Sequence, residues 1–301
     1  MTNSKPNSAL NTPGKLLSGL NEIADRYDGY ILDLWGTIHN GIEPLPGAVE
    51  CLKALKAAGK DVLILSNAPR RIGAVVDRMD AVGIPRTVYG PVLSSGEAGW
   101  LALRDRNDSW HRRLGERAFL VGEAGDESIL QDQQIQEVTT LDEASFLLCV
   151  GAFRRSDTVA DYELLLADAY RLQLPMMCVN PDQEVLRGPN REICAGAIAT
   201  AYEDFGGDVH YHGKPYRPIY DLSFKRLSGI DPSRILAVGD SLCTDVAGAN
   251  AVGIDSLFIV GGILAQELRS AACGDLRADA LALLYQKYGQ TPNWAAAAFR
   301  W

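Results

Sequence analysis

The chain contains the stretch Gly29-Tyr30-Ile31-Leu32-Asp33-Leu34-Trp35-Gly36-Thr37, in which a short apolar run ends at the carboxylate of Asp33 and gives way to small residues. This pattern is typical of a buried parallel strand that delivers a reactive side chain to the carboxyl edge of a sheet. The stretch therefore predicts an α/β fold, with Asp33 as a candidate nucleophile.

The residues that follow predict a strand, a helix and a second strand. Apolar residues recur at helical spacing between Gly47 and Gly59, and 61–67 is a continuous apolar run that ends in two small polar residues. Two strands joined by a helix over this length indicate a right-handed parallel crossover. Asn67 is expected to cap the next helix, which should run from about Pro69 to Ala81.

The same alternation continues to the C-terminal part of the chain. Further strands are expected at 118–122, 146–152, 176–179, 234–240 and 256–260, and further helices at 158–172 and 218–227. We interpret the pattern as a doubly wound parallel sheet, formed by 1–86 and 208–301, that is interrupted by an inserted α/β domain at 87–207. The segment from Ile263 has helical periodicity, and its aromatic end, 293–301, should dock on the core.

The bulk composition excludes several classes of partner. The chain has 301 residues, of which 47% are hydrophobic, and a formal net charge of -9. An acidic chain lacks the clustered basic residues that nucleic-acid binding requires, so small ligands are favoured. No apolar run reaches the roughly 18 residues of a membrane span. The polar segment 1–15 does not resemble a signal peptide, so a cytoplasmic protein is expected, with a homodimer left open.

The cysteines do not form a recognisable pattern. They are widely spaced, contain no CxxC pair and have no histidine spaced as a zinc partner; they are Cys51, Cys149, Cys178, Cys194, Cys243 and Cys273. Ordinary buried thiols are therefore expected rather than a disulfide framework or a metal site.

Polar residues follow several of the predicted strands. Asp33, the pair Ser66-Asn67, and Asp240 with Asp245 should meet at one edge of the sheet. Any single aspartate there could simply cap a helix. Several carboxylates in one place repel each other and need a cation, and an all-oxygen set suits Mg²⁺.

Lys214 lies between Gly213 and Pro215, just before a predicted helix. A lone lysine is most often a solvated surface charge. In this setting it could instead hold a phosphate and restrain the nucleophilic carboxylate, with Ser66 and the N–H groups of the following helix start as neutral donors.

The motifs together resemble a known family. Asp33-Leu34-Trp35-Gly36-Thr37, Ser66-Asn67, Gly213-Lys214-Pro215 and Gly239-Asp240-Ser241-Leu242-Cys243-Thr244-Asp245 are similar, in order and spacing, to the four motifs of the haloacid dehalogenase superfamily. The insertion, with Asn180-Pro181-Asp182 near its end, resembles the α/β cap of the class IIA branch, which includes NagD-type phosphatases and nitrophenylphosphatases.

The resemblance implies phosphoryl transfer from a small phosphorylated metabolite, a sugar or nucleotide phosphate. Asp33 would attack phosphorus and form an aspartyl-phosphate that water hydrolyses. Mg²⁺ would be held by Asp33, the carbonyl of Trp35, Asp240 and Asp245. The phosphate and substrate would be bound by Gly36, Ser66, Asn67, Lys214, Asn180 and Asp182. Arg187 and Arg191 are candidates to read the substrate, with exposed loop charges as the alternative.

The sequence departs from the family at Trp35, where the phosphatases carry a second aspartate that acts as general acid and base. Indole can do neither, and this type of catalysis is worth typically about 10²- to 10⁴-fold. A slow or leaving-group-restricted hydrolase is therefore expected. His39 is a candidate substitute acid, although a polar loop residue is the favoured interpretation. The alternatives are a hydrolase of another leaving group, since dehalogenases carry an aromatic residue here, and a binding protein without turnover.

Overall fold

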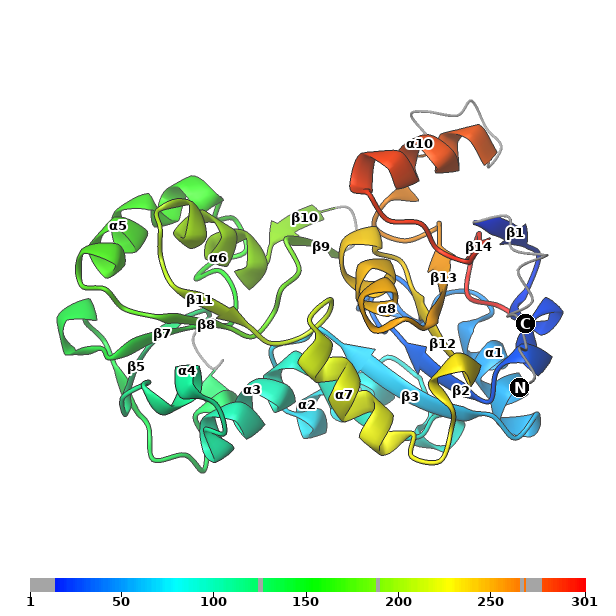
Figure 1. Cartoon of the computed structure of the whole chain (residues 1–301), viewed down its shortest axis with the longest axis horizontal. Coiled ribbons are helices and arrows are strands. Elements are labelled where there is room, and N and C mark those ends of the chain that lie inside the picture. Colours follow the sequence, from blue (N-terminus) through cyan, green and yellow to red (C-terminus); the bar gives the residue numbers. More distant parts are fainter. Residues whose placement is uncertain (1–13, 124–126, 188–189, 266–267, 269–277) are drawn as a thin grey trace, which may run out of the picture.

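The computed structural model describes residues 14–123, 127–187, 190–265, 268 and 278–301. The described chain forms two parallel sheets, each covered by helices, which lie at opposite ends of an elongated molecule (Figure 1). An α/β fold with an inserted α/β domain is therefore confirmed.

The larger sheet has seven strands, and every neighbouring pair is parallel. In spatial order they are β1 (Lys15–Leu17), β14 (Trp294–Ala296), β13 (Asp255–Ile259), β12 (Ile235–Gly239), β2 (Gly29–Leu32), β3 (Asp61–Ser66) and β4 (Val92–Ser94). The accompanying helices are α1 (Ala48–Ala57), α2 (Ile72–Ala81), α7 (Arg217–Arg226), α8 (Ala247–Val252) and α10 (Ala278–Tyr288). The predicted crossover from β2 through α1 to β3 is confirmed.

Alternating side chains bury both faces of this sheet. Tyr30 and Leu32 point into a core with α1 and α2, whereas Ile31 between them packs with residues of α7 and α8. Because side chains along a strand alternate between faces, a run that is apolar throughout suits a strand covered on both sides. This two-sided core keeps the polar residues at the carboxyl edge.

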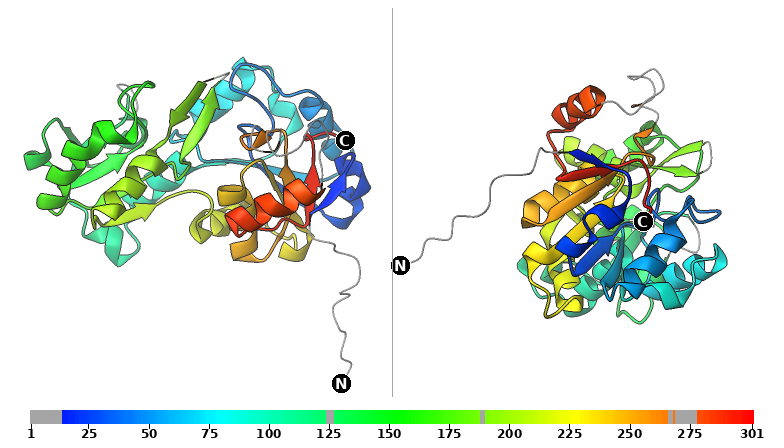
Figure 2. Two further views of the ribbon diagram at one scale, coloured as in Figure 1. Left: turned by 90° about the horizontal axis from the view of Figure 1, so that it is seen from above. Right: turned by 90° about the vertical axis from the view of Figure 1, so that its right-hand side faces the viewer.

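The smaller sheet has five parallel strands: β11 (Val209–Tyr211), β8 (Met176–Cys178), β7 (Phe146–Cys149), β5 (Arg117–Val121) and β6 (Gln136–Val138). Its helices are α3 (Ser95–Asp105), α4 (Ser109–Arg112), α5 (Glu163–Arg171) and α6 (Ala195–Asp204). An antiparallel hairpin of β9 (Glu184–Arg187) and β10 (Asn190–Ile193) projects toward the larger sheet (Figures 1 and 2). The remaining turns of 3₁₀ helix are Leu20–Glu22, Ala24–Arg26, Arg86–Val88, Glu127–Ile129, Leu141–Glu143, Val159–Tyr162 and Pro232–Arg234, and Leu242–Val246 is a π-helical turn.

The division into 1–86, 87–207 and 208–301 stays a proposal, and strand pairing favours slightly different junctions. Strand β4 pairs with β3 of the larger sheet, and β11 pairs with β8 of the smaller one. We therefore place the junctions near residues 95 and 212.

One local prediction differs from the structure, and one strand was not predicted. The helix expected from Pro69 begins at Ile72 with Arg71 at its N-cap, because the side chain of Asn67 is engaged in contacts with distant residues instead. The docking of the C-terminal tail is confirmed by the burial of Trp294 and Phe299. The tail also supplies strand β14, which the sequence did not predict.

Four cysteines are buried as expected, but Cys243 is exposed, and none of these five forms a disulfide. Cys273 and the segment 1–13 lie outside the described residues. No helix in the described part of the chain is long and apolar enough to cross a membrane. The cytoplasmic location and the homodimer stay predictions.

Candidate active site

Three carboxylates meet at the carboxyl edge of the larger sheet. Asp33 follows β2, Asp240 follows β12, and Asp245 lies in the turn after it. One oxygen from each lies within 4.8 Å of the others, and all three side chains are buried. The backbone N–H of Asp33 donates to the carbonyl of Val238 at 2.8 Å, so parallel pairing of β2 with β12 sets their register. The predicted convergence of these residues is confirmed.

Gly36 brings the loop after β2 close to this cluster. Its φ is +80°, and a Cβ atom there would lie 2.0 Å from Oδ2 of Asp240. The same Asp240 oxygen accepts a hydrogen bond from the N–H of Ile263 at 2.7 Å. A larger residue at position 36 would therefore displace the Asp240 carboxylate.

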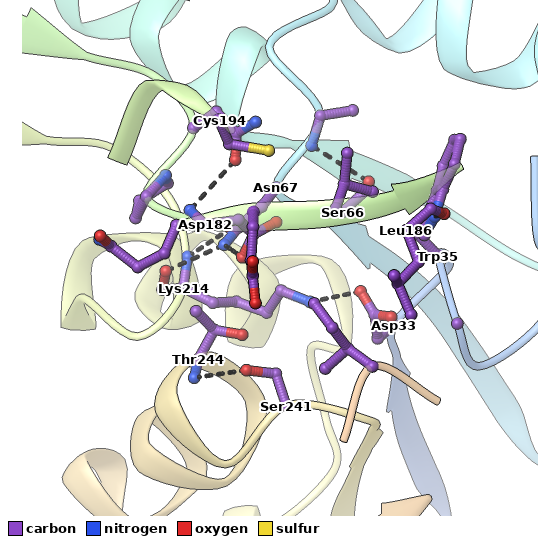
Figure 3. A pocket seen from close by; sticks show the side chains of 18 of the residues that line it. Asp33, Trp35, Ser66, Asn67, Asp182, Leu186, Cys194, Lys214, Ser241 and Thr244 are labelled. Atoms are coloured by element: carbon purple, nitrogen blue, oxygen red, sulfur yellow. Dashed lines mark hydrogen bonds and ion pairs between the residues drawn. The ribbon is translucent and has the colours of Figure 1, made fainter. Parts of the chain in front are cut away.

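Lys214 is buried within the cluster and is not a surface charge. Its Nζ donates to Oδ1 of Asp33 at 2.5 Å and to Oδ1 of Asp245 at 2.7 Å. The amide of Asn67 holds the backbone of Lys214, because Oδ1 accepts its N–H at 2.8 Å and Nδ2 donates to its carbonyl at 3.0 Å. Asn67 thus helps to fix the ammonium group of Lys214 beside Asp33, although the two residues lie 147 positions apart in the sequence (Figure 3).

Burial and mutual repulsion shape the ionisation of the cluster. Burial, together with the neighbouring Asp33 and Asp245, raises the pKa of Asp240 well above its usual value. Burial likewise raises the pKa of Asp245 to about 6, against the opposing effect of Lys214. Burial lowers the pKa of Lys214, but the carboxylates outweigh it and hold that pKa well above the ordinary value. One ammonium group facing three carboxylates leaves an excess of negative charge, which favours a bound cation.

Replacing Lys214 by methionine should destabilise the metal-free protein by about 3–5 kcal/mol, because it leaves buried carboxylates without their partner. Urea unfolding in the presence of a chelator measures this loss. Lys225→Met is the matched control, since Lys225 is an exposed residue of α7 and its replacement should change the free energy of unfolding by less than about 0.5 kcal/mol. An equal, small loss in both variants would contradict the structural role of Lys214.

The remaining predicted phosphate and substrate residues line a cavity of about 1150 Å³ between the two sheets. Oγ of Ser66 accepts the N–H of Ala68 at 3.2 Å, which leaves its hydroxyl hydrogen for a ligand. Nδ2 of Asn67 donates to Oδ1 of Asp182 at 2.9 Å, and the side-chain carbonyl of Asn180 accepts the N–H of Asp182 at 3.2 Å. The structure thus brings the Asn180–Asp182 loop of the inserted domain onto the cluster.

The two candidate arginines differ in position. Arg187 lines the cavity, where it forms an ion pair with Glu192 at 3.1 Å. Arg191 is exposed and is paired with Glu184. Arg191 is therefore an exposed charge, as the alternative prediction stated. Arg187 is the arginine that faces the cavity.

Trp35 reaches from the loop after β2 to the hairpin of the inserted domain. Its Nε1 donates to the carbonyl of Leu186 in β9 at 2.9 Å. The Arg187 guanidinium lies 5.3 Å from the centre of the indole ring. The sequence contains no signal of this contact, because it depends on where the inserted domain sits.

His39 lies in the loop after β2, and its side chain is buried there. Its ring is only 1% exposed and packs edge-on against Trp35, with the ring centres 5.2 Å apart. Nδ1 accepts the N–H of Gly41 at 2.8 Å. Burial, aided by Arg78, lowers the pKa of His39 to about 4, so the ring is uncharged at neutral pH. An uncharged imidazole is a poor general acid, so we assign His39 a packing role.

Comparison with known proteins identifies the family of the chain. The haloacid dehalogenase-like hydrolase family matches residues 30–136, and a HAD-hydrolase-like family matches residues 211–284. The crystal structure of a hydrolase of the haloacid dehalogenase-like family from Brucella suis is similar with a TM-score of 0.80 and 31% identity, over 94% of this chain and 99% of that one.

Curated relatives are more distant. The chain is 25% identical to the 5'-nucleotidase YutF of Bacillus subtilis, over 80% of this chain and 90% of that protein. It is also 25% identical to the D-glycerol 3-phosphate phosphatase of Mycobacterium tuberculosis, over 81% of this chain and 66% of that protein. The matched residues include Asp33, Ser66-Asn67, Lys214 and Asp240, which the fold gathers at one cavity. The chain therefore belongs to the haloacid dehalogenase-like family of hydrolases.

Proposed function

We propose that this hydrolase cleaves phosphomonoesters of small metabolites, such as sugar or nucleotide phosphates, with Mg²⁺ and with Asp33 as the nucleophile. The observation that carries the proposal is the ammonium group of Lys214, which is buried against Asp33 within a cluster of three carboxylates. One relative is named a 5'-nucleotidase and another a D-glycerol 3-phosphate phosphatase, which supports the substrate class.

The donor set fits Mg²⁺. The candidate ligands are oxygen atoms of Asp33 and Asp240 and the carbonyl of Trp35, and hard cations of this size prefer oxygen. Asp245 is better suited to an outer position, because Oδ1 is engaged by Lys214 and Oδ2 by the N–H of Ser241. When bound, Mg²⁺ would offset the repulsion between the carboxylates and a phosphate.

Side chains of the protein would bind the phosphate and carry out the attack on phosphorus. Lys214 would hold the phosphoryl oxygens beside Asp33, and Ser66 would donate its hydroxyl hydrogen to the same anion. Oxygen of Asp33 would attack phosphorus as the ester oxygen departs, and water would then cleave the aspartyl-phosphate. The hairpin and the Asn180–Asp182 loop would enclose the substrate. Because Trp35 cannot donate a proton, the ester oxygen would have to depart unprotonated, which favours good leaving groups.

Magnesium should both support turnover and stabilise the fold. At about one hundred times its dissociation constant, a ligand that binds only the native state adds about 2.7 kcal/mol to the free energy of unfolding. Asp240→Asn should abolish this stabilisation and the Mg²⁺-dependent hydrolysis of aryl phosphates. Asp142→Asn, at an exposed position, is the control that should retain both. Hydrolysis that persists in a chelator would contradict the proposed metal dependence.

A further inference from the structure

Three of the four histidines of the chain gather in the inserted domain, away from the active-site cavity. His111 comes from α4, and His210 and His212 come from β11 and the residue after it. One ring nitrogen from each lies within 4.8 Å of the others. His111 and His212 are buried, with 2% and 8% of their surface exposed, and His210 is half-buried. None of the three is among the described residues that line the cavity.

Two of the ring nitrogens face each other within hydrogen-bonding distance. Nε2 of His111 lies 3.0 Å from Nε2 of His212. Two imidazole ligands of a tetrahedral zinc ion are separated by about 3.3 Å, since each Zn–N bond is about 2.0–2.1 Å. The observed separation is therefore close to that of a ligand pair, and a small outward movement of the two rings would admit the ion.

Asp108 prepares His111 as a ligand. Its Oδ2 lies 2.6 Å from Nδ1 of His111, and a carboxylate can only accept, so Nδ1 carries the proton. In the neutral ring, Nε2 then presents its lone pair to the cluster. A carboxylate behind a ligating histidine is the usual outer partner at zinc sites, where it orients the ring and raises its basicity.

Further contacts hold the other side of the cluster. The indole of Trp110 stacks on His210, with the ring centres 4.8 Å apart and an angle of 27° between the planes. Nε1 of Trp110 also donates to Asp208, just before β11, at 3.0 Å. These contacts tie α4 to β11, so the three rings are positioned by rigid elements and not by a loose surface.

We propose that His111, His210 and His212 bind a zinc ion, with water as the fourth ligand. His212 lies two residues before Lys214, so the ion would brace the segment that leads from the inserted domain to the active site. The site is distinct in chemistry from the carboxylate cluster, since imidazole nitrogen favours zinc and carboxylate oxygen favours magnesium. The proposal does not depend on the substrate or on the role of Asp33.

The test uses full-length protein without a histidine tag, stripped with a chelator and then dialysed into excess Mg²⁺ to compete for the acidic cluster. We expect each chain to take up one equivalent of Zn²⁺ in this buffer, and Co²⁺ in its place to give the visible absorption of a nitrogen-ligated tetrahedral site. Asp240→Asn, which removes a ligand of the acidic cluster, should retain this equivalent.

Two variants locate the zinc ion. His210→Gln should weaken Zn²⁺ binding at least about 10-fold, and Asp108→Asn about 10- to 100-fold. Because His210 is half-buried, its variant should stay folded in a chelator, and only the wild type should then gain thermal stability from Zn²⁺. The proposal is wrong if the wild type takes up no Zn²⁺, or if uptake is lost in Asp240→Asn but unchanged in His210→Gln.

Discussion

Asp33→Asn should lower the turnover of phosphate monoesters by at least about 10³-fold, because an amide oxygen cannot form the covalent phosphoryl intermediate. The change is nearly isosteric, and Lys214 can still donate to the amide oxygen in place of Oδ1. Initial rates with an aryl phosphate in saturating Mg²⁺ measure the loss.

The fold of the variant provides the control for this result. Removing one of three mutually repelling carboxylates should leave the metal-free protein at least as stable as the wild type in urea unfolding. Asp142→Asn should keep full activity. Turnover that persists in Asp33→Asn would show that Asp33 is not the nucleophile. If the variant loses both its activity and its fold, trapping the phosphorylated wild-type enzyme identifies the nucleophile instead.

Trp35→Asp should raise the hydrolysis of alkyl phosphates, by up to about 10²- to 10⁴-fold, because it restores a carboxyl group that can protonate the leaving oxygen. Aryl phosphates should gain much less, since their leaving oxygens are stable without a proton. The ratio of kcat/KM for the two ester types, measured in wild type and variant, reports the effect.

Trp35→Phe separates this chemistry from the contact with the inserted domain. Phenylalanine keeps an aromatic ring near His39 but loses the hydrogen bond from Nε1 to Leu186. It should change both ester types by the same factor and so leave their ratio unaltered. An equal gain on both esters in Trp35→Asp, or none, would contradict the role of Trp35 as a missing acid.

Much of the core followed from local patterns. The apolar run before Asp33, the helix closed by Gly59 and the strand that ends at Ser66 were predictable, because each depends on side-chain periodicity and on residues near in sequence. The convergence of Asp33 and Asp240 was also predictable. Parallel strands share a carboxyl edge, so two strand ends far apart in sequence must meet there once the sheet is assumed.

Other features came only from packing. The side chain of Asn67 suits a helix cap by itself, but its partners include Asp182 and Lys214, which lie more than 100 residues away in the sequence. A similar distance in sequence separates His111 from His212, whose ring nitrogens meet in the folded protein.

The sequence by itself determined the central strands of the larger sheet and the convergence of polar residues at their carboxyl ends, because these follow from periodicity and from the topology of parallel strands. The tertiary structure decided what the loops and the inserted domain contribute: the indole of Trp35 on Leu186, the burial of His39 and the gathering of three histidines. Those contacts depend on how segments far apart in the sequence pack together. No local propensity encodes that arrangement.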